Sequence, residues 1–337
     1  MGLKLSILDQ SPVFPGETVE DAFRHTLEIA RLADRLGYHR FWVSEHHDSR
    51  QVAGSSPEVL IAYLLAHTER IRVGSGGVML QHYSPYKVAE NFNVLSALAP
   101  GRVDLGIGRA PGGLPVSTRA LQQGVAAPAP LEEKLEELAR FLRGPLPEGH
   151  PLAGLHASPA AKVPPALHLL GASASSAELA ARQGLPYAFA LFINGDADVA
   201  ESAFKTYRER FGSETEASPE PILALSVIVA DTDEEAAALA ADFKNVKVKL
   251  ASGKSVTVGT VEQAETFGKQ SGESYEIEVR DADITKGSKE TVRKRLLELR
   301  DRFGVDELIV TTAVPDFSSR VRSFLLLQEA FAETRVG

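Results

Sequence analysis

The stretch IRVGSGGVMLQHYSPYKVAENFNVLSALAPGRVDLGIGR, residues 71–109, contains one complete strand–helix–strand unit. Apolar and β-branched residues predict strands over 71–80 and 103–107, and apolar residues at helical spacing predict a helix over 85–98. The Pro-Gly pair at 100–101 ends that helix. A helix that connects two buried strands is the crossover typical of a parallel sheet.

The same alternation extends along the chain in both directions. Apolar runs predict eight strands, over residues 3–8, 40–43, 71–80, 103–107, 166–170, 186–191, 222–229 and 307–311. Amphipathic runs predict helices over residues 18–35, 57–67, 85–98, 131–142, 175–183, 197–211, 233–243, 289–303 and 318–332. Eight such units in 337 residues favour an α/β fold, a closed (β/α)8 TIM barrel, over an open sheet. No linker divides the chain, so we expect a single domain over residues 1–337.

One segment, at about 244–286, breaks this alternation. It contains three runs in which apolar and polar residues alternate, at 246–250, 255–261 and 275–279, and a period of two predicts strands rather than helix. A structureless loop of this length is uncommon in a compact domain. We therefore expect an inserted, partly β lid or hairpin, and the alternative is a solvent-exposed decoration.

The composition excludes several classes of protein. The chain has 36 Lys and Arg against 45 Asp and Glu, and a net charge of −9 argues against a nucleic-acid or anionic-membrane binder. The absence of Cys excludes disulfides, thiolate metal sites and thiol nucleophiles, and it fits a cytoplasmic location. The first ten residues do not predict a signal peptide, and no run of about 18 apolar residues is present, so we expect no membrane span.

In a (β/α)8 barrel the active site lies at the carboxyl ends of the strands. Polar groups gather there, in the segments 9–11, 44–48, 76–77, 82–83, 108–109, 171–176 and 192–194. The run GASASS at 171–176 opens a helix, and free N–H groups at a helix N-terminus favour an anion. Arg109 and Arg119 could add planar cations that suit phosphate. An equally good interpretation makes Ser173 an N-cap and the two arginines surface ion partners.

The pair His46-His47 lies at the end of the second predicted strand. Adjacent strand residues point to opposite faces, so a shared metal ion is disfavoured and no metal is expected. His46 at the barrel mouth is favoured as an acid–base group, because an ordinary imidazole titrates near neutrality. Glu45 is expected to be a buried structural carboxylate paired with an arginine or a backbone amide. The glycines at 74–77 and 106–108 lack the full dinucleotide fingerprint, so a Rossmann-type nicotinamide site is not expected.

At these residues the sequence resembles the bacterial luciferase-like, flavin-dependent monooxygenases. The matching blocks are GYHRFWVSEHHD (37–48), IRVGSGGVML (71–80), SPYKVAENFNVLSALAPGRVDLGIGRAPG (84–112), LLGASASSAELAARQGLPYAFA (169–190) and GVDELIVTT (304–312). They extend almost from end to end, with a gap at 244–286. The forms at 71–80 and 105–112 look most like a subgroup of general luciferase-family oxidoreductases rather than light-emitting enzymes.

The resemblance implies a (β/α)8 barrel that binds FMN, usually as a homodimer. Reduced FMN would come from a separate NAD(P)H flavin reductase. Dioxygen would add at the flavin C(4a) atom, and the resulting peroxide would oxidise a small organic substrate. The alternatives are a deazaflavin- or FMN-dependent reductase or dehydrogenase of the same superfamily, a non-catalytic flavin-binding protein, and an unrelated barrel hydrolase.

The resemblance also carries over residue by residue. His46 matches the active-site histidine, Arg109 and Arg119 match two arginines that contact the FMN phosphate, and Ser173 and Ser176 match hydroxyls that hold it, in a turn that includes Ala174 and Ser175. Gly76-Gly77 matches a dipeptide with a cis bond under the flavin ring.

The sequence also departs from the family at three places. Gln81 replaces a common proline, the link after Arg109 is short, and the segment 244–286 looks β-like where relatives carry a mobile lid. These departures put the substrate in doubt rather than the fold. We expect a dimer through helices 57–67 and 85–98.

Overall fold

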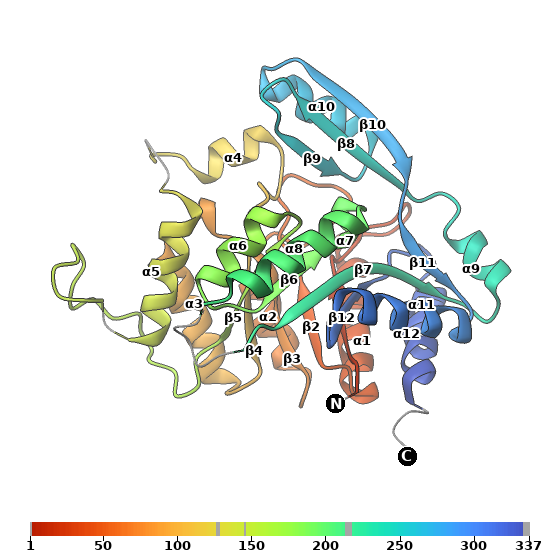
Figure 1. Ribbon diagram of the computed structural model, residues 1–337, viewed down its shortest axis with the longest axis horizontal. Coiled ribbons are helices and arrows are strands. Elements are labelled where there is room, and N and C mark those ends of the chain that lie inside the picture. Colours follow the sequence, from red (N-terminus) through yellow and green to blue (C-terminus); the bar gives the residue numbers. More distant parts are fainter. Residues whose placement is uncertain (1, 126–128, 145, 213–217, 333–337) are drawn as a thin grey trace.

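A computed structural model describes residues 2–125, 129–144, 146–212 and 218–332, and its centre is a closed parallel barrel (Figure 1). The barrel strands are β1 (Lys4–Asp9), β2 (Arg40–Val43), β3 (Arg72–Met79), β4 (Val103–Gly108), β5 (Ala166–Gly171), β6 (Tyr187–Ala190), β7 (Pro221–Val229) and β12 (Glu307–Thr311). They pair in chain order, β12 pairs with both β7 and β1, and the β6–β7 pairing completes the ring. The predicted TIM barrel is therefore confirmed.

Helices between the strands cover the outside of the barrel. They are α1 (Val19–Leu36), α2 (Pro57–Leu65), α3 (Pro85–Leu98), α5 (Leu131–Arg143), α6 (Ala174–Arg182), α8 (Ala197–Arg210), α9 (Asp233–Leu239), α11 (Lys289–Phe303) and α12 (Phe317–Ala332). Local signals set their ends: Thr18 and Asp21 form a capping box at the start of α1, and Gly37, at φ 78°, ends it in the left-handed conformation. No helix in the described part of the chain is long and apolar enough to cross a membrane.

The inserted segment is a small subdomain of its own. β8 (Lys244–Leu250), β9 (Ser255–Val258) and β10 (Tyr275–Asp281) form an antiparallel sheet in the order β10-β8-β9. The three predicted β runs are therefore confirmed, except that the second, predicted to reach residue 261, ends at Val258. The helix α10 (Val261–Ser271) covers one face of the sheet. A fourth strand, β11 (Ile284–Gly287), returns to the barrel and pairs with the second half of β7. The expectation of a lid or hairpin was thus incomplete, because it missed α10 and β11.

Other differences lie where the chain turns at a strand end. The strand predicted to reach residue 80 stops at Met79, and a 3-10 turn, η1 (Leu80–His82), follows. The short helices α4 (Pro115–Leu121) and α7 (Leu191–Asn194) were not predicted. The helix predicted over 233–243 ends at Leu239, since Lys244 already begins β8. Segments this short contain too few residues to show a periodic pattern, so tertiary contacts determine their secondary structure.

Two apolar layers hold the barrel together. The larger lies between the strands and the surrounding helices and includes Phe41, Val43, Phe92 and Leu105, all nearly or fully buried. The smaller lies inside the barrel and consists of Leu8, Trp42, Ala188, Ile222, Ala224 and Ile309, with Leu170 and Phe192 packed against it. Trp42 inside and Val43 outside show the alternation of a strand that is buried on both faces.

A layer of buried charge lies beneath the inner apolar layer. The Arg40 guanidinium donates to Asp104 at 2.9 Å and to Glu307 at 2.7 and 3.0 Å, so it joins β2, β4 and β12. Asp104 also accepts from Trp42 Nε1 at 3.0 Å. The guanidinium groups of Arg40 and Arg72 hold the pKa of Asp104 at about 2, below its ordinary value of 3.8, although burial opposes them.

We expect Asp104→Asn to lower the free energy of unfolding by about 3–5 kcal/mol, because it leaves Arg40 buried with one carboxylate partner fewer. Urea unfolding at pH 7 measures this loss. Since the folded-state pKa lies below the unfolded one, the stabilisation by Asp104 is present above pH 3.8 and is lost as the pH falls toward 2. Asp198→Asn, in an exposed pair with Arg302, is the control and should unfold like the wild type. Equal midpoints for both variants would contradict the assignment.

Candidate functional site

The side chains that follow β2, at residues 44–47, point alternately to the inside and the outside of the barrel. Trp42 lies in the inner apolar layer, so by alternation Ser44 and His46 face the barrel axis, while Glu45 and His47 face outward. Ser44 Oγ lies 3.1 Å from His46 Nδ1, and Glu45 Oε1 lies 2.8 Å from His47 Nε2. The structure therefore separates the two adjacent histidines. In the described residues, no group of three or more metal-ligating side chains is close enough to hold an ion.

His46 is half-buried, and its environment changes its titration. Burial lowers the pKa of the imidazole to about 4, and the neighbouring His47 adds to this, although the Glu45 carboxylate opposes it. The expectation of two forms near neutrality used an ordinary pKa and is corrected here: the ring is neutral at pH 7. A neutral imidazole at the mouth of the barrel can accept a proton or donate one hydrogen bond.

Glu45 is a structural carboxylate, as the sequence indicated. Its Oε2 atom accepts from the backbone N–H of Met79 at 3.1 Å, and its Oε1 atom accepts from the Tyr83 hydroxyl at 2.8 Å. These bonds fix the end of β2 to the turn after β3. Burial and the negative charge of Glu45 raise the pKa of Tyr83, so this phenol remains a hydrogen-bond donor.

The peptide bond between Gly76 and Gly77 is cis, as predicted. A Cβ atom on Gly76 would lie 2.8 Å from Leu8 Cδ1 and 3.2 Å from Trp42 Cε3, and one on Gly77 would lie 2.6 Å from the carbonyl oxygen of Gly106. A side chain at Gly77 would clash with the backbone of β4, and one at Gly76 would require Leu8 to move. The carboxyl-terminal half of β3 therefore presents bare backbone beside the inner apolar layer.

The turn before α6 presents backbone donors beyond the end of β5. Ser173 is the N-cap, and it shares a capping box with Ser176 in which each hydroxyl accepts from the other's backbone N–H at 3.3 Å. Ser176 is buried and also contacts the Tyr187 hydroxyl at 2.9 Å, so it faces the protein rather than the mouth. The backbone N–H groups of Ala174 and Ser175, both exposed, have no acceptor among the described residues. The N-cap interpretation of Ser173 is thus confirmed, and an anion would meet these two N–H groups.

The two arginines differ in position. Arg109 directly follows β4, which pairs with β5 in the register Ile107↔Leu169, so it lies level with Gly171 at the neighbouring strand end. Arg119 lies on α4, a short helix that Figure 1 shows outside the ring of barrel strands. Both side chains are exposed, and neither makes an ion pair or hydrogen bond with a described residue. The interpretation of the two as surface ion partners is therefore wrong.

The loop after Arg109 and the turn after β3 are held by hydrogen bonds that the sequence did not predict. The backbone N–H of His47 donates to the carbonyl of Gly112 at 2.7 Å, and His82 Nε2 lies 2.8 Å from the carbonyl of Pro111. Gln81, which departs from the family pattern, donates to the carbonyl of Ala110. The side chain of Lys134 on α5 binds three carbonyl groups of the η1 turn, those of Leu80, Gln81 and Tyr83. Spacing in the sequence gives no signal for such side chain–carbonyl contacts.

Three side chains on neighbouring strands also face the barrel axis without partners. Gln10, Thr311 and Ser226 follow the inward positions of β1, β12 and β7, and Thr311 and Ser226 are register partners. All three are half-buried, and their polar atoms bond to no described residue. They are neutral, so this side of the mouth offers hydrogen bonds without charge.

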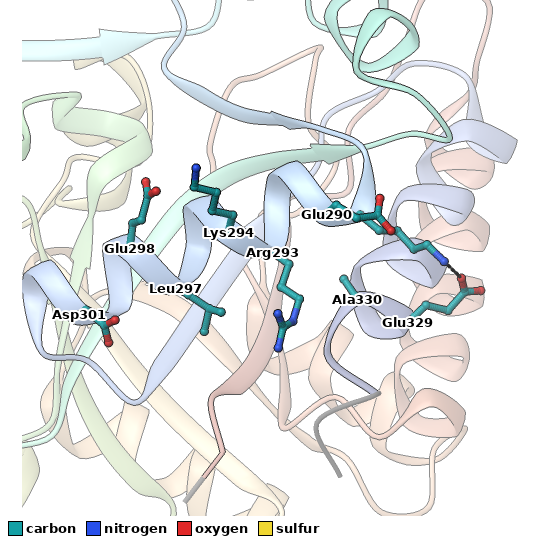
Figure 2. Close-up of a pocket in the computed structure, with 9 residues that line it drawn as sticks. Glu290, Arg293, Lys294, Leu297, Glu298, Asp301, Glu329 and Ala330 are labelled. Carbon is teal, nitrogen blue, oxygen red and sulfur yellow. Dashed lines mark hydrogen bonds and ion pairs between the residues drawn. The ribbon is translucent and has the colours of Figure 1, made fainter. Parts of the chain in front are cut away.

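A groove of about 510 Å³ lies elsewhere, on the outer surface between α11 and α12 (Figure 2). Charged side chains line it, and Lys289 pairs with Glu329 at 3.2 Å across it. None of the residues predicted for the functional site lines this groove. We therefore place the candidate site at the strand ends.

Comparison with known proteins identifies the family of this chain. A family model described as luciferase-like monooxygenase matches residues 3–307. The N-acetyl-S-alkylcysteine monooxygenase of Bacillus subtilis is 44% identical over 97% of this chain and 98% of its own length. The crystal structure of apo-MsnO8 is 39% identical, covers 98% of each chain and superposes with a TM-score of 0.78. The oxygenating constituent of 3,6-diketocamphane monooxygenase from Pseudomonas putida, solved with FMN, has the same fold at 19% identity, covering 99% of this chain and 98% of its own, with a TM-score of 0.72.

Proposed function

Because the chain belongs to the luciferase-like monooxygenase family, we propose that it uses reduced FMN and dioxygen to oxidise a small organic molecule. One observation carries this proposal. Among the described residues, the backbone N–H groups of Ala174 and Ser175 have no acceptor, and the guanidinium of Arg109, which has no ion pair, lies at the end of the neighbouring strand. Free donors and an unpaired cation suit a phosphate dianion. The bare backbone at Gly76–Gly77 suits a flat ring at the other end of the same cofactor.

Different residues of this chain would bind the phosphate, support the ring and transfer the proton. Arg109, with Arg119 nearby, and the turn at 173–176 would bind the phosphate, and Gly76–Gly77 would support the ring. Bound reduced FMN would supply two electrons, so that one atom of dioxygen enters the substrate and the other leaves as water. His46, neutral at pH 7, would accept or return a proton at the reacting oxygen, with Ser44 orienting its ring.

The substrate class that we propose rests on the Bacillus subtilis monooxygenase and on the uncharged side chains that line one side of the barrel mouth. That relative is named for N-acetyl-S-alkylcysteine, a thioether that carries an amide and a carboxylate. The unpartnered Gln10, Ser226 and Thr311 could hydrogen-bond an amide. We therefore propose an N-acetylated, S-substituted cysteine as the first substrate to test. Reduced FMN would come from a separate NAD(P)H flavin reductase in the cytoplasm.

We expect Arg109→Ala to weaken FMN binding by about 1.5–3 kcal/mol, the worth of a hydrogen bond to a charged group. Fluorescence titration with FMN and with a deazaflavin, each oxidised and reduced, measures this. Arg140→Ala, which removes an exposed arginine of α5, is the control and should bind like the wild type. Unchanged FMN affinity would remove Arg109 from the site, and a preference of the wild type for the deazaflavin would favour the reductase alternative.

His46→Ala should bind FMN nearly as the wild type does and lose turnover by about 100-fold or more, as expected for a general acid–base group. Mass spectrometry of the oxidised N-acetyl-S-alkylcysteine, with reduced FMN supplied by a flavin reductase, measures turnover. His46→Gln keeps a hydrogen-bonding side chain that cannot be protonated near neutrality, so it separates proton transfer from orientation. Wild-type turnover in His46→Ala would exclude a catalytic role for this ring.

We also propose a homodimer through α2 and α3, which carry exposed apolar side chains. Val59 is 67% exposed, Tyr63 50%, Val94 44% and Leu98 71%. Large apolar side chains that gather on adjacent helices mark an interaction surface. We expect Leu98→Glu to give a monomer by light scattering at micromolar concentration, whereas Val279→Glu, on β10 at 50% exposure, should leave the mass unchanged. A monomeric wild type would contradict the proposal.

A further inference from the structure

The guanidinium of Arg109 is free, so its position depends on the backbone that carries it. The side chain is exposed and makes no ion pair or hydrogen bond with any residue that the structure describes. The main chain of its two neighbours, Gly108 and Ala110, therefore determines where the guanidinium can reach. A contact that fixes these neighbours also fixes the direction in which Arg109 leaves the barrel.

Both neighbours are tied to the segment that follows the cis peptide of β3. Gly108, the last residue of β4, is the register partner of Met79. On the other side of Arg109, the side-chain amide nitrogen of Gln81 donates to the carbonyl oxygen of Ala110. Gln81 thus holds the residue that directly follows Arg109.

The loop beyond Ala110 has little stiffness of its own. It continues with Pro111, Gly112 and Gly113, and Gly112 has a φ of 67°, in the left-handed region. His82 Nε2, next to Gln81, lies 2.8 Å from the carbonyl oxygen of Pro111. Two consecutive side chains of the η1 turn therefore bind two consecutive carbonyl groups of this loop.

The backbone of Gln81 is itself fixed. Lys134 Nζ, on α5, donates to the carbonyl oxygen of Gln81 at 3.0 Å, and Gln122 Nε2 donates to the same oxygen at 3.4 Å. The same ammonium group also binds the carbonyl oxygens of Leu80 and Tyr83. The Gln81 side chain therefore connects the loop after Arg109 to a turn that α5 holds in place.

The Gln81 amide is only half satisfied. Its nitrogen binds Ala110, but its oxygen, Oε1, is buried and accepts from no residue in the described part of the chain. Exchanging the two atoms would set the amide oxygen against a carbonyl oxygen, so this orientation is the better one. A buried acceptor without a donor costs about as much stability as one neutral hydrogen bond contributes. Stability therefore does not explain this glutamine, and such exceptions concentrate at functional sites.

We infer that Gln81 is a positioning residue for Arg109. By holding Ala110 it limits the positions of the guanidinium, so that less freedom is lost when Arg109 binds the anionic group of the cofactor. This inference rests on the proposed function. It gives the bond between Gln81 and Ala110 a role in binding rather than in stability, through a residue that need not contact the cofactor.

The test compares Gln81→Met with Gln183→Met. Both remove a half-buried amide, but Gln183 binds Glu136 at 3.2 Å on the outer helices, away from the strand ends. Anaerobic titrations with reduced FMN and with reduced riboflavin, which lacks the phosphate, measure cofactor binding. The same titrations in an Arg109→Ala background show whether the effect acts through Arg109. Urea unfolding of the apoprotein measures stability.

We expect Gln81→Met to bind FMN about tenfold more weakly and riboflavin unchanged, with a urea midpoint no lower than that of the wild type. In the Arg109→Ala background, Gln81→Met should cause no further loss. Gln81→Leu removes the same amide with a side chain of different shape and should give the same results, which separates the lost bond from altered packing. Gln183→Met should bind both flavins as the wild type does.

Three results would overturn the inference: an equal loss for FMN and riboflavin, a loss that persists without Arg109, or wild-type affinity in both Gln81 variants. The rise of the melting temperature with inorganic phosphate separates the inference from the proposed function, because it needs no flavin. If the wild type binds no flavin but is stabilised by phosphate, the proposed function fails. The inference then stands only if Gln81→Met and Arg109→Ala both reduce that rise. A wild type that responds to neither ligand overturns both.

Discussion

The bidentate pairing of Arg40 with Glu307, shared with Asp104, is the interaction on which the rest of the barrel depends. It joins β2, β4 and β12 inside the fold, where a lone guanidinium would be costly. Asp104 in turn holds the indole of Trp42, and Trp42 with Leu8 leaves no room for a side chain at Gly76. The buried charges thus fix the position of Trp42, which in turn lies against the bare backbone at Gly76.

The sequence alone predicted the barrel because most strands are apolar runs buried on both faces, and most of the long helices between them bury apolar residues at helical spacing. Such patterns are local, and they repeat eight times. The helix α10 was missed because its apolar residues, such as Ala264 and Phe267, are few and face the inserted sheet rather than the barrel. The turns η1 and α7 are held by contacts from distant residues, Lys134 and Thr257 among them, which no local pattern reveals.

The candidate site was predictable in outline and not in detail. Barrel topology and a resemblance placed His46, Arg109 and the turn at 173–176 at one end of the fold. The sequence does not show which side chains are buried. Burial lowers the pKa of His46, so its ring is neutral at pH 7. Ser176 is also buried, and its hydroxyl contacts Tyr187 instead of the barrel mouth.

The insertion leaves and re-enters the barrel at nearly one point. The N–H of Ala282 donates to the carbonyl of Phe243 at 3.0 Å, and Lys244 pairs with Asp281 at the same base. A segment whose two ends already touch can be lengthened, shortened or exchanged without moving any barrel strand. Evolution can therefore lengthen, shorten or replace this one module while the strands of the barrel keep their geometry.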